Sequence, residues 1–339
     1  MFESLHALEL EPLLHLQQMA GLTGPMKALS YLGPSAFLLA LVGLVYLCFD
    51  SRLGARLLAL YFASEVITHF MKLVFHSPRP FWIDPRVQAF EPEATSYGFP
   101  SGHALVATCV WFFFASTARK PWVWITSVIA VLLVSISRVY LGTHFISDVA
   151  GGCLLGSVVL TIFLLSQRRV ADWLKQLSFR RQILLCVSIT VGIVFCGWFL
   201  RAMTADSAEA LRWTKYTSAA RSFRSLGSYA GTILGLGIGF AMAARAARFA
   251  AGGSIRQRIL RIVLIAIPAT GYWLRPKGLL ANLPDLVSFS LLFVACAFAA
   301  WAFTFVVPWL FLKIKLAEPL ASADSLASSA EPKHEPNLP

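Results

Sequence analysis

His144 and Asp148 stand four residues apart in the stretch SRVYLGTHFISDVAGG, residues 137 to 152. At the start of a helix this spacing places both side chains on one face, where the carboxylate can accept a hydrogen bond from one ring nitrogen of the histidine. The other ring nitrogen is then left free, and an imidazole held in this way can act as a nucleophile or as a general base. The competing interpretation is a structural pair within the helix, with Arg138 at a membrane border.

A second stretch, PSGH at residues 100 to 103, precedes a long apolar run. Ser101 can cap the following helix, Gly102 lets a ligand approach the backbone, and the amides at a helix N-terminus attract an anion. His103 then falls in the first helical turn. Taken alone, an ordinary cap with an interfacial histidine explains this stretch more simply.

A third stretch, KLVFHSPRP at residues 72 to 80, holds Lys72 and Arg79 seven residues apart. Two helical turns would put both side chains on nearly one face, although Pro78 and Pro80 predict that the helix ends there and that only Lys72 is helical. A snorkelling lysine and a border arginine explain this stretch alone equally well. Charges that gather in three separate joins on one side of a membrane are costly, however, unless they are used.

Metal binding is the competing chemistry, because the same region contains several potential ligands: Glu65, His69, His76, His103, His144 and Asp148. Three cations among them, Lys72, Arg79 and Arg138, would repel a metal ion and favour a phosphate. Glu65 and His69 are interpreted as a polar contact inside a helix bundle. We therefore predict a phosphate site without a metal ion.

The three stretches lie between segments that are too apolar for a soluble chain. Of the 339 residues, 57% are hydrophobic and 14% are charged, which indicates a membrane protein. A bilayer core requires about 20 apolar residues in helical form. The predicted fold is an all-α, polytopic helical membrane protein with spans at Pro34–Phe49, Leu57–Phe75, His103–Thr117, Trp122–Val139, Ser147–Ser166, Ile183–Leu200, Leu226–Ala244, Ile259–Leu274 and Leu286–Leu312.

The net charge of +12 is distributed over alternate joins, which argues against nucleic acid as a partner. By the positive-inside rule these joins are cytoplasmic, so the N-terminus is predicted outside and the C-terminus inside. The loop after the sixth span breaks the pattern, because it holds both basic and acidic residues. The basic residues of the alternate joins are Arg52, Arg56, Arg119, Lys120, Arg168, Arg169, Lys175, Arg180, Arg181, Arg245, Arg248, Arg256 and Arg258.

Both ends of the chain differ from the apolar middle. The first thirty residues include three glutamates and lack a basic start followed by an apolar core, so they predict an interfacial amphipathic helix or a loose tail instead of a signal peptide. The end of the chain, from about residue 317, is small, polar and proline-containing, which indicates disorder. The cysteines lie in or beside apolar spans, without CxxC spacing, and are interpreted as packing residues: Cys48, Cys109, Cys153, Cys186, Cys196 and Cys296.

In combination, the three polar stretches resemble the complete motif of the type 2 phosphatidic acid phosphatase (PAP2) superfamily. The parts are K-x6-RP, PSGH and SR-x5-H-x3-D, each in order and each in a join between hydrophobic spans. The resemblance covers about residues 34 to 200, the six-span core of the integral-membrane lipid phosphatases. The region from about 201 to 315 departs from it and is predicted to add about three spans without an assigned role. The predicted division is an interfacial segment at 1–30, the six-helix core at 31–200, additional transmembrane helices at 201–315 and a disordered tail at 316–339.

The resemblance implies a covalent mechanism. His144 would attack phosphorus in line and form a phosphohistidine, Asp148 would orient it, and His103 would protonate the leaving oxygen and later help to activate water. No metal ion and no other cofactor is implied.

The resemblance also implies the groups that bind phosphate. Lys72, Arg79 and Arg138, with the hydroxyl of Ser101 and the amide of Gly102, would hold the phosphate oxygens and offset their charge in the transition state. Guanidinium forks match this geometry better than ammonium groups, so the two arginines should resist replacement by lysine.

A site at headgroup level in an apolar bundle favours a phosphorylated lipid that arrives from the bilayer. An outward-facing site in a bacterial inner membrane would suit undecaprenyl diphosphate, phosphatidate, phosphatidylglycerophosphate or a lipid A phosphate, and the resemblance favours the first two. The alternatives are a lipid-to-lipid phosphotransferase with the same intermediate, a lipid transporter that binds the headgroup without chemistry, and a scaffold protein. The sequence carries no signal for an oligomeric state.

Overall fold

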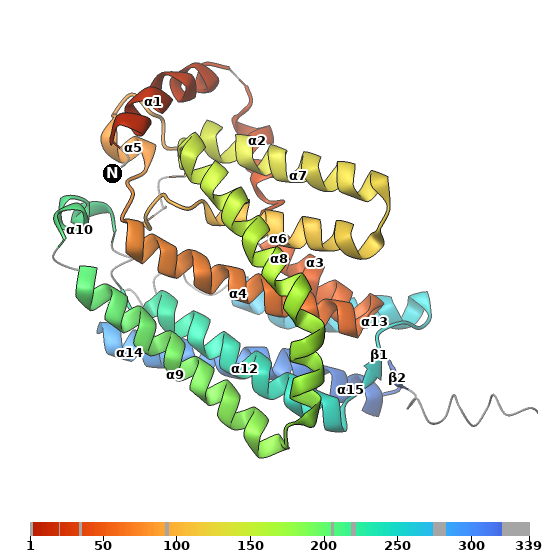
Figure 1. Ribbon diagram of the computed structural model, residues 1–339. Helices are drawn as coiled ribbons and strands as arrows, with labels where there is room; N and C mark the ends of the chain where they lie inside the picture. Colours follow the sequence, from red (N-terminus) through yellow and green to blue (C-terminus); the bar gives the residue numbers. More distant parts are fainter. Residues whose placement is uncertain are drawn as a thin grey trace, which may run out of the picture.

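The computed structural model describes residues 3–19, 21–33, 36–91, 95–204, 207–217, 222–273 and 283–320, with the side chains of 36 and 265–273 left out. The chain is almost entirely helical, and its described strands are the two-residue pair β1 (Phe249–Ala250) and β2 (Glu318–Pro319) (Figure 1). The helices are α1 (Glu3–Gln17), α2 (Thr23–Ser30), α3 (Ala36–Leu44), α4 (Ser51–Phe75), α5 (Pro80–Ile83), α6 (Gly102–Ala118), α7 (Pro121–Tyr140), α8 (Ile146–Gln176), α9 (Phe179–Thr204), α10 (Ala208–Arg212), α12 (Arg224–Ala246), α13 (Ile255–Trp273), α14 (Asp285–Trp301) and α15 (Val307–Lys313). Single π-helical turns follow α3 (Val45–Phe49) and α14 (Ala302–Val306), and a short 3₁₀ turn follows α10 (Thr214–Tyr216).

Within the described residues, six helical stretches are long and apolar enough to cross a membrane, so the protein is a multi-pass membrane protein. These stretches are Ser51–Ile83, Pro121–Tyr140, Ile146–Gln176, Phe179–Thr204, Arg224–Ala246 and Asp285–Lys313. Two shorter apolar helices, Phe37–Phe49 and Gly102–Ala118, correspond to the first and third predicted spans. The all-α, polytopic prediction is confirmed.

The C-terminal part contains two of the long stretches. The eighth predicted span, Ile259–Leu274, falls on α13, which carries Arg256, Arg258 and Arg261 in its first two turns and is not among the long apolar stretches of the described residues. Leu274, where that span was predicted to end, lies outside the described residues. Three C-terminal spans therefore remain a prediction, as does the disordered tail, because residues 321–339 are also outside the described part.

Glycines let α8 cross α6 closely. A Cβ atom on Gly152 would lie 2.6 Å from the carbonyl oxygen of Ser101, and one on Gly156 would lie 2.7 Å from that of Leu105. A side chain at either position would push the helices apart, because the atoms it meets are backbone. This contact holds the PSGH stretch against the first turns of α8.

A longer glycine row joins α12 to α14. Gly227, Gly231, Gly235 and Gly239 follow one another every fourth residue. Cβ atoms on the first three would lie 2.6, 2.2 and 2.1 Å from carbonyl oxygens of α14. The two helices lie side by side along their length, with α9 on another side of α12 (Figure 1). The sequence analysis did not identify this row.

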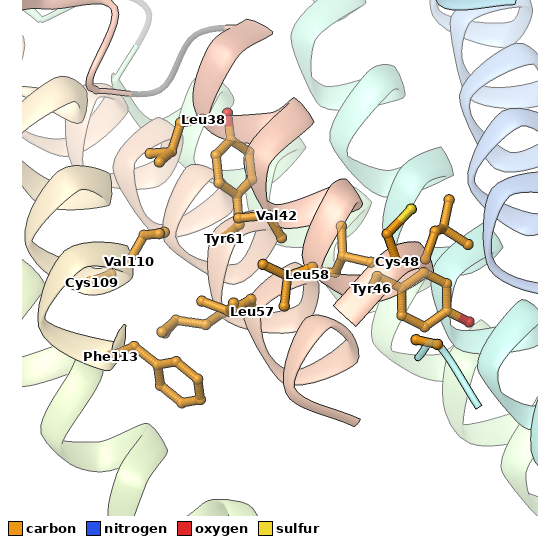
Figure 2. Close-up of a cluster of buried hydrophobic side chains, with 14 of the residues drawn as sticks. Leu38, Val42, Tyr46, Cys48, Leu57, Leu58, Tyr61, Cys109, Val110 and Phe113 are labelled. Atoms are coloured by element: carbon orange, nitrogen blue, oxygen red, sulfur yellow. The ribbon is translucent and has the colours of Figure 1, made fainter. Parts of the chain in front are cut away.

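The largest buried apolar cluster joins α3, α4 and α6 at some distance along the helices from the polar joins. Figure 2 shows side chains of this cluster: Leu38 and Val42 of α3, Tyr46 and Cys48 of the π-helical turn that follows it, Leu57, Leu58 and Tyr61 of α4, and Cys109, Val110 and Phe113 of α6. Cys48 and Cys109 are fully buried here, and all six cysteines are free. The packing role predicted for these two cysteines is confirmed.

Candidate active site

The His144–Asp148 pair forms where the chain passes from α7 into α8. His144 precedes the helix, Phe145 is its N-cap residue, and Asp148 lies in its first turn. The Oδ2 atom of Asp148 accepts a hydrogen bond from the backbone N–H of Phe145 at 2.9 Å and lies 3.4 Å from Nδ1 of His144. The two side chains meet as predicted, but not because both lie on one helical face. Only Asp148 lies on α8, and its carboxylate reaches back past the start of the helix to His144.

The turn that carries His144 depends on Gly142. This residue has φ +70°, and a Cβ atom on it would lie 2.4 Å from the carbonyl oxygen of Gln88. Only glycine combines this conformation with so close an approach. A side chain at position 142 would therefore push the turn away from the loop that contains Gln88.

His144 is 1% exposed. Burial, and then the charges of Arg79, Lys72 and Arg138, hold its pKa well below the usual value of histidine. The imidazole is therefore neutral at pH 7, as a nucleophile must be.

Ser101, Gly102 and His103 begin α6 beside this turn. The backbone N–H of Ser101 donates to the carbonyl oxygen of Asp148 at 2.9 Å, which ties the second stretch to the third. Ser101 was expected to cap the helix with its hydroxyl, but it does not. Its Oγ is buried without a hydrogen-bond partner among the described residues. A Cβ atom on Gly102 would lie 3.1 Å from Thr68, and one on Gly33 would lie 3.0 Å from the ring of His103.

Lys72 and Arg79 meet at Ser96. Lys72 lies in the last turn of α4, whose C-cap is His76 in the left-handed conformation, and Arg79 precedes α5. Lys72 Nζ lies 3.1 Å from Ser96 Oγ; Arg79 donates from Nη2 to the same Oγ at 3.1 Å and from Nε to the Ser96 carbonyl at 2.6 Å. Arg79 Nη1 also donates to the carbonyl of Thr143 at 2.8 Å, directly before His144.

Arg138 lies in the last turn of α7 and is 3% exposed. Its Nη1 donates to Ser30 Oγ at 2.6 Å and to Glu91 Oε2 at 2.8 Å, while Nε is buried without a partner among the described residues. Glu91 lies in the loop between α5 and α6, of which residues 92–94 lie outside the described part.

Ser30, Glu91 and Ser96 are the site neighbours that sequence reasoning missed. Each lies in a loop or at a helix end and reaches a cation 17 to 108 residues away along the chain. No spacing rule connects such positions. The structure thus gathers all eight predicted site residues around His144 and adds these three.

Three of the candidate metal ligands, Glu65, His69 and His76, make their contacts outside this cluster. Tyr229 of α12 donates to Glu65 Oε2 at 3.3 Å, and its ring lies 5.4 Å from that of His69, so both residues contact Tyr229. His76 packs instead on Tyr97, with ring centroids 4.7 Å apart. Within the described residues no three His, Cys, Asp or Glu side chains are arranged to hold a metal ion.

Chemically, the cluster suits a tetrahedral anion. Three cations, a buried serine hydroxyl and the N-terminus of α6 can surround its oxygens, with a neutral imidazole beside them. Residues 53–172, which contain all of these groups, match the model of the PAP2 superfamily. Residues 227–319 match the model described as PAP2 superfamily phosphatase, transmembrane extension.

Curated proteins show the same relationship. The chain is similar to undecaprenyl-diphosphatase of Sulfolobus acidocaldarius, with 35% identity over 150 residues that cover 44% of this chain and 72% of that protein. It is also similar to phosphatidylglycerophosphatase B of Bacillus subtilis, with 33% identity, 39% of this chain and 68% of the relative. A match to glucose-6-phosphatase 3 of Mus musculus is longer, with 28% identity over 220 residues, 55% of this chain and 61% of the relative. The arrangement of the site and these matches lead to one conclusion: the chain belongs to the PAP2 superfamily.

Proposed function

We propose that the protein is a membrane lipid phosphatase that hydrolyses a lipid phosphate monoester or diphosphate through a phosphohistidine, without a metal ion. The observation that carries the proposal is the contact of Arg79 with Thr143, 2.8 Å, which places a phosphate-binding cation beside a neutral, carboxylate-held imidazole. Family membership makes the same chemistry expected of this site.

In the proposed first step, the free ring nitrogen of His144 attacks phosphorus and the bond from phosphorus to the lipid oxygen breaks. His103 gives its proton to that oxygen, and Asp148 stabilises the cation that forms on His144. Lys72, Arg79 and Arg138 offset the charge on the three remaining phosphate oxygens.

In the second step, water attacks the phosphohistidine while His103 accepts its proton. The nitrogen–phosphorus bond breaks, and inorganic phosphate leaves with His144 neutral again. Ser101 Oγ and the Gly102 amide hold the phosphate oxygens through both steps, and a buried hydroxyl that has no other partner among the described residues suits this role.

A lipid is the proposed substrate because the site lies at the ends of membrane-spanning helices. The names of two relatives, an undecaprenyl-diphosphatase and a phosphatidylglycerophosphatase, support a lipid phosphate or diphosphate, and we favour the undecaprenyl diphosphate or phosphatidate type. The match to a glucose-6-phosphatase makes glucose 6-phosphate the soluble compound to test against it.

The proposed location is the outer face of a bacterial inner membrane. α6 runs from Ser101 at the site to Arg119, and α8 runs from the site to Lys175. The basic ends of these helices would face the cytoplasm by the positive-inside rule, which leaves His144 outside.

The test is phosphate release by the purified, detergent-solubilised protein in EDTA, with a His144→Ala control. The panel contains undecaprenyl diphosphate, phosphatidate, phosphatidylglycerophosphate and glucose 6-phosphate. Release from a lipid that disappears in His144→Ala is the expected result. Release from glucose 6-phosphate alone would contradict the lipid substrate, activity in His144→Ala would contradict the mechanism, and a requirement for metal would contradict metal independence.

Phosphoryl transfer is separated by adding a second lipid with a free hydroxyl group. A phosphotransferase would phosphorylate that lipid and release little inorganic phosphate, whereas a hydrolase would release phosphate at the same rate with or without it. A transporter would bind the lipid equally well with and without His144 and release no phosphate.

A further inference from the structure

α1 lies across the start of α8, next to the turn that carries His144 (Figure 1). His6 is 2% exposed and its ring stacks on that of Phe145, with centroids 4.0 Å apart and planes 7° apart. Leu13 is buried with Val87 and Val149. The helix is therefore packed on the core beside the site.

Glu9 makes the polar contact at the centre of this packing. Its Oε1 accepts a hydrogen bond from the backbone N–H of Ser147 at 2.9 Å, and its Oε2 accepts one from the Ser147 hydroxyl at 2.9 Å. Ser147 is the second residue of α8, so its N–H has no acceptor within the helix. A carboxylate there also interacts favourably with the positive end of the helix.

We infer that Glu9 is a positioning residue: it fixes the first turn of α8, and with it the orientation of Asp148 and His144. Two carboxylates then hold that turn, Asp148 through the N–H of Phe145 and Glu9 through the N–H of Ser147. Neither hydrogen bond alone fixes the turn from both sides. The inference rests on the proposed function, because it assigns Glu9 a part in the reaction of His144.

The other carboxylates of α1 make a contrast with Glu9. Glu3 pairs with Arg212 and Glu11 pairs with Arg86, but these pairs are exposed on the surface, with side-chain exposures of 54 to 75%. Exposed ion pairs of this kind contribute little to the stability of the fold. Glu9 is 9% exposed, and it is the one of the three that reaches the site turn.

The experiment compares Glu9→Ala, Glu9→Gln and Glu11→Ala in the phosphate-release assay, with the inhibition constant of inorganic phosphate measured for each. Glutamine keeps an oxygen for the Ser147 N–H and has an amide that can donate to the Ser147 hydroxyl. We expect Glu9→Ala to lower kcat by about tenfold or more while KM and phosphate inhibition stay within about threefold, because misplacement of an attacking group costs rate more than binding. Glu9→Gln should restore most of kcat, and Glu11→Ala should match the wild type.

A second measurement is a double-mutant cycle with Ser147→Ala. If Glu9 acts through Ser147, the loss in kcat for the double variant is smaller than the product of the single losses. Wild-type kcat in Glu9→Ala, an equal loss of kcat and phosphate binding, or no recovery in Glu9→Gln would each overturn the positioning role. A wild-type protein that releases no phosphate from any substrate would overturn the proposed function and this inference together, which distinguishes the two failures.

Discussion

Arg79→Lys keeps a positive charge at the site and removes the guanidinium fork. Arg79 is 4% exposed and donates to two backbone carbonyls, those of Ser96 and Thr143, and to the Ser96 hydroxyl. An ammonium group donates from one point and cannot reach acceptors on both sides of the fork. At least one buried carbonyl therefore loses its partner, at a cost of about 1–3 kcal/mol in the free energy of unfolding.

The effect on turnover is expected to be larger. In the proposed mechanism, the change removes a bidentate donor to the phosphate oxygens where charge develops in the transition state, so kcat/KM is expected to fall by about 10²- to 10³-fold. Turnover is expected to fall for a second reason. Without the hydrogen bond from Arg79 to its carbonyl oxygen, Thr143 is less firmly held, and Thr143 directly precedes His144.

The assay measures kcat/KM for phosphate release and the thermal midpoint in detergent for Arg79→Lys. Arg86→Lys is the matched control, since Arg86 lies in the following loop and pairs with Asp84 and Glu11 at the surface. The control should keep wild-type activity and midpoint. If Arg79→Lys keeps more than half of kcat/KM, the fork does not act on the phosphate and the reasoning is refuted.

Three further changes test other parts of the structure. His103→Ala should slow the return of free enzyme, so that labelled phosphoenzyme accumulates after an alkaline quench; an unchanged rate would assign the acid to another group. Lys72→Met should move the acid limb of kcat/KM to higher pH, because Lys72 is one of the cations that lower the pKa of His144, and without it the imidazole stays protonated to higher pH; a limb that stays in place would show that Lys72 does not lower this pKa. Gly231→Leu should lower the thermal midpoint strongly, since its Cβ would lie 2.2 Å from the Phe293 carbonyl, whereas Gly192→Leu, at a position with no neighbour within 4 Å, should leave it unchanged.

The sequence was informative where a short rule connects residues. The spacing of His144 and Asp148 predicted a pair, and the structure places them 3.4 Å apart. The apolar runs predicted helices, because about 20 apolar residues in a row have few other uses. Both signals are local, because the first lies within about one helical turn and the second within a single helix.

The rest depended on contacts between distant segments. Ser96 meets Arg79 and Lys72, and Ser30 meets Arg138, across 17 to 108 residues, and nothing in the local sequence marks these partners. α1 was predicted to lie at the membrane interface, but the contact of Glu9 with Ser147 spans 138 residues and could not be foreseen. The end of α8 also differs from the prediction. The helix continues to Gln176, ten residues past the predicted boundary at Ser166, and its basic residues lie on the additional turns.

The hydrogen bond between Tyr229 and Glu65 has a consequence for the order in which the chain is made. Glu65 lies within α4 and leaves the ribosome 164 residues before its partner in α12. A carboxyl group without a partner in the bilayer costs about 2.5–3.5 kcal/mol at the centre of a helix. Until α12 has been inserted, the carboxyl group of Glu65 lacks the hydrogen bond from Tyr229 and has the charge of Lys72 on its own helix to offset part of this cost. A helix of the C-terminal extension thus completes the polar contacts of one of the first helices to be made.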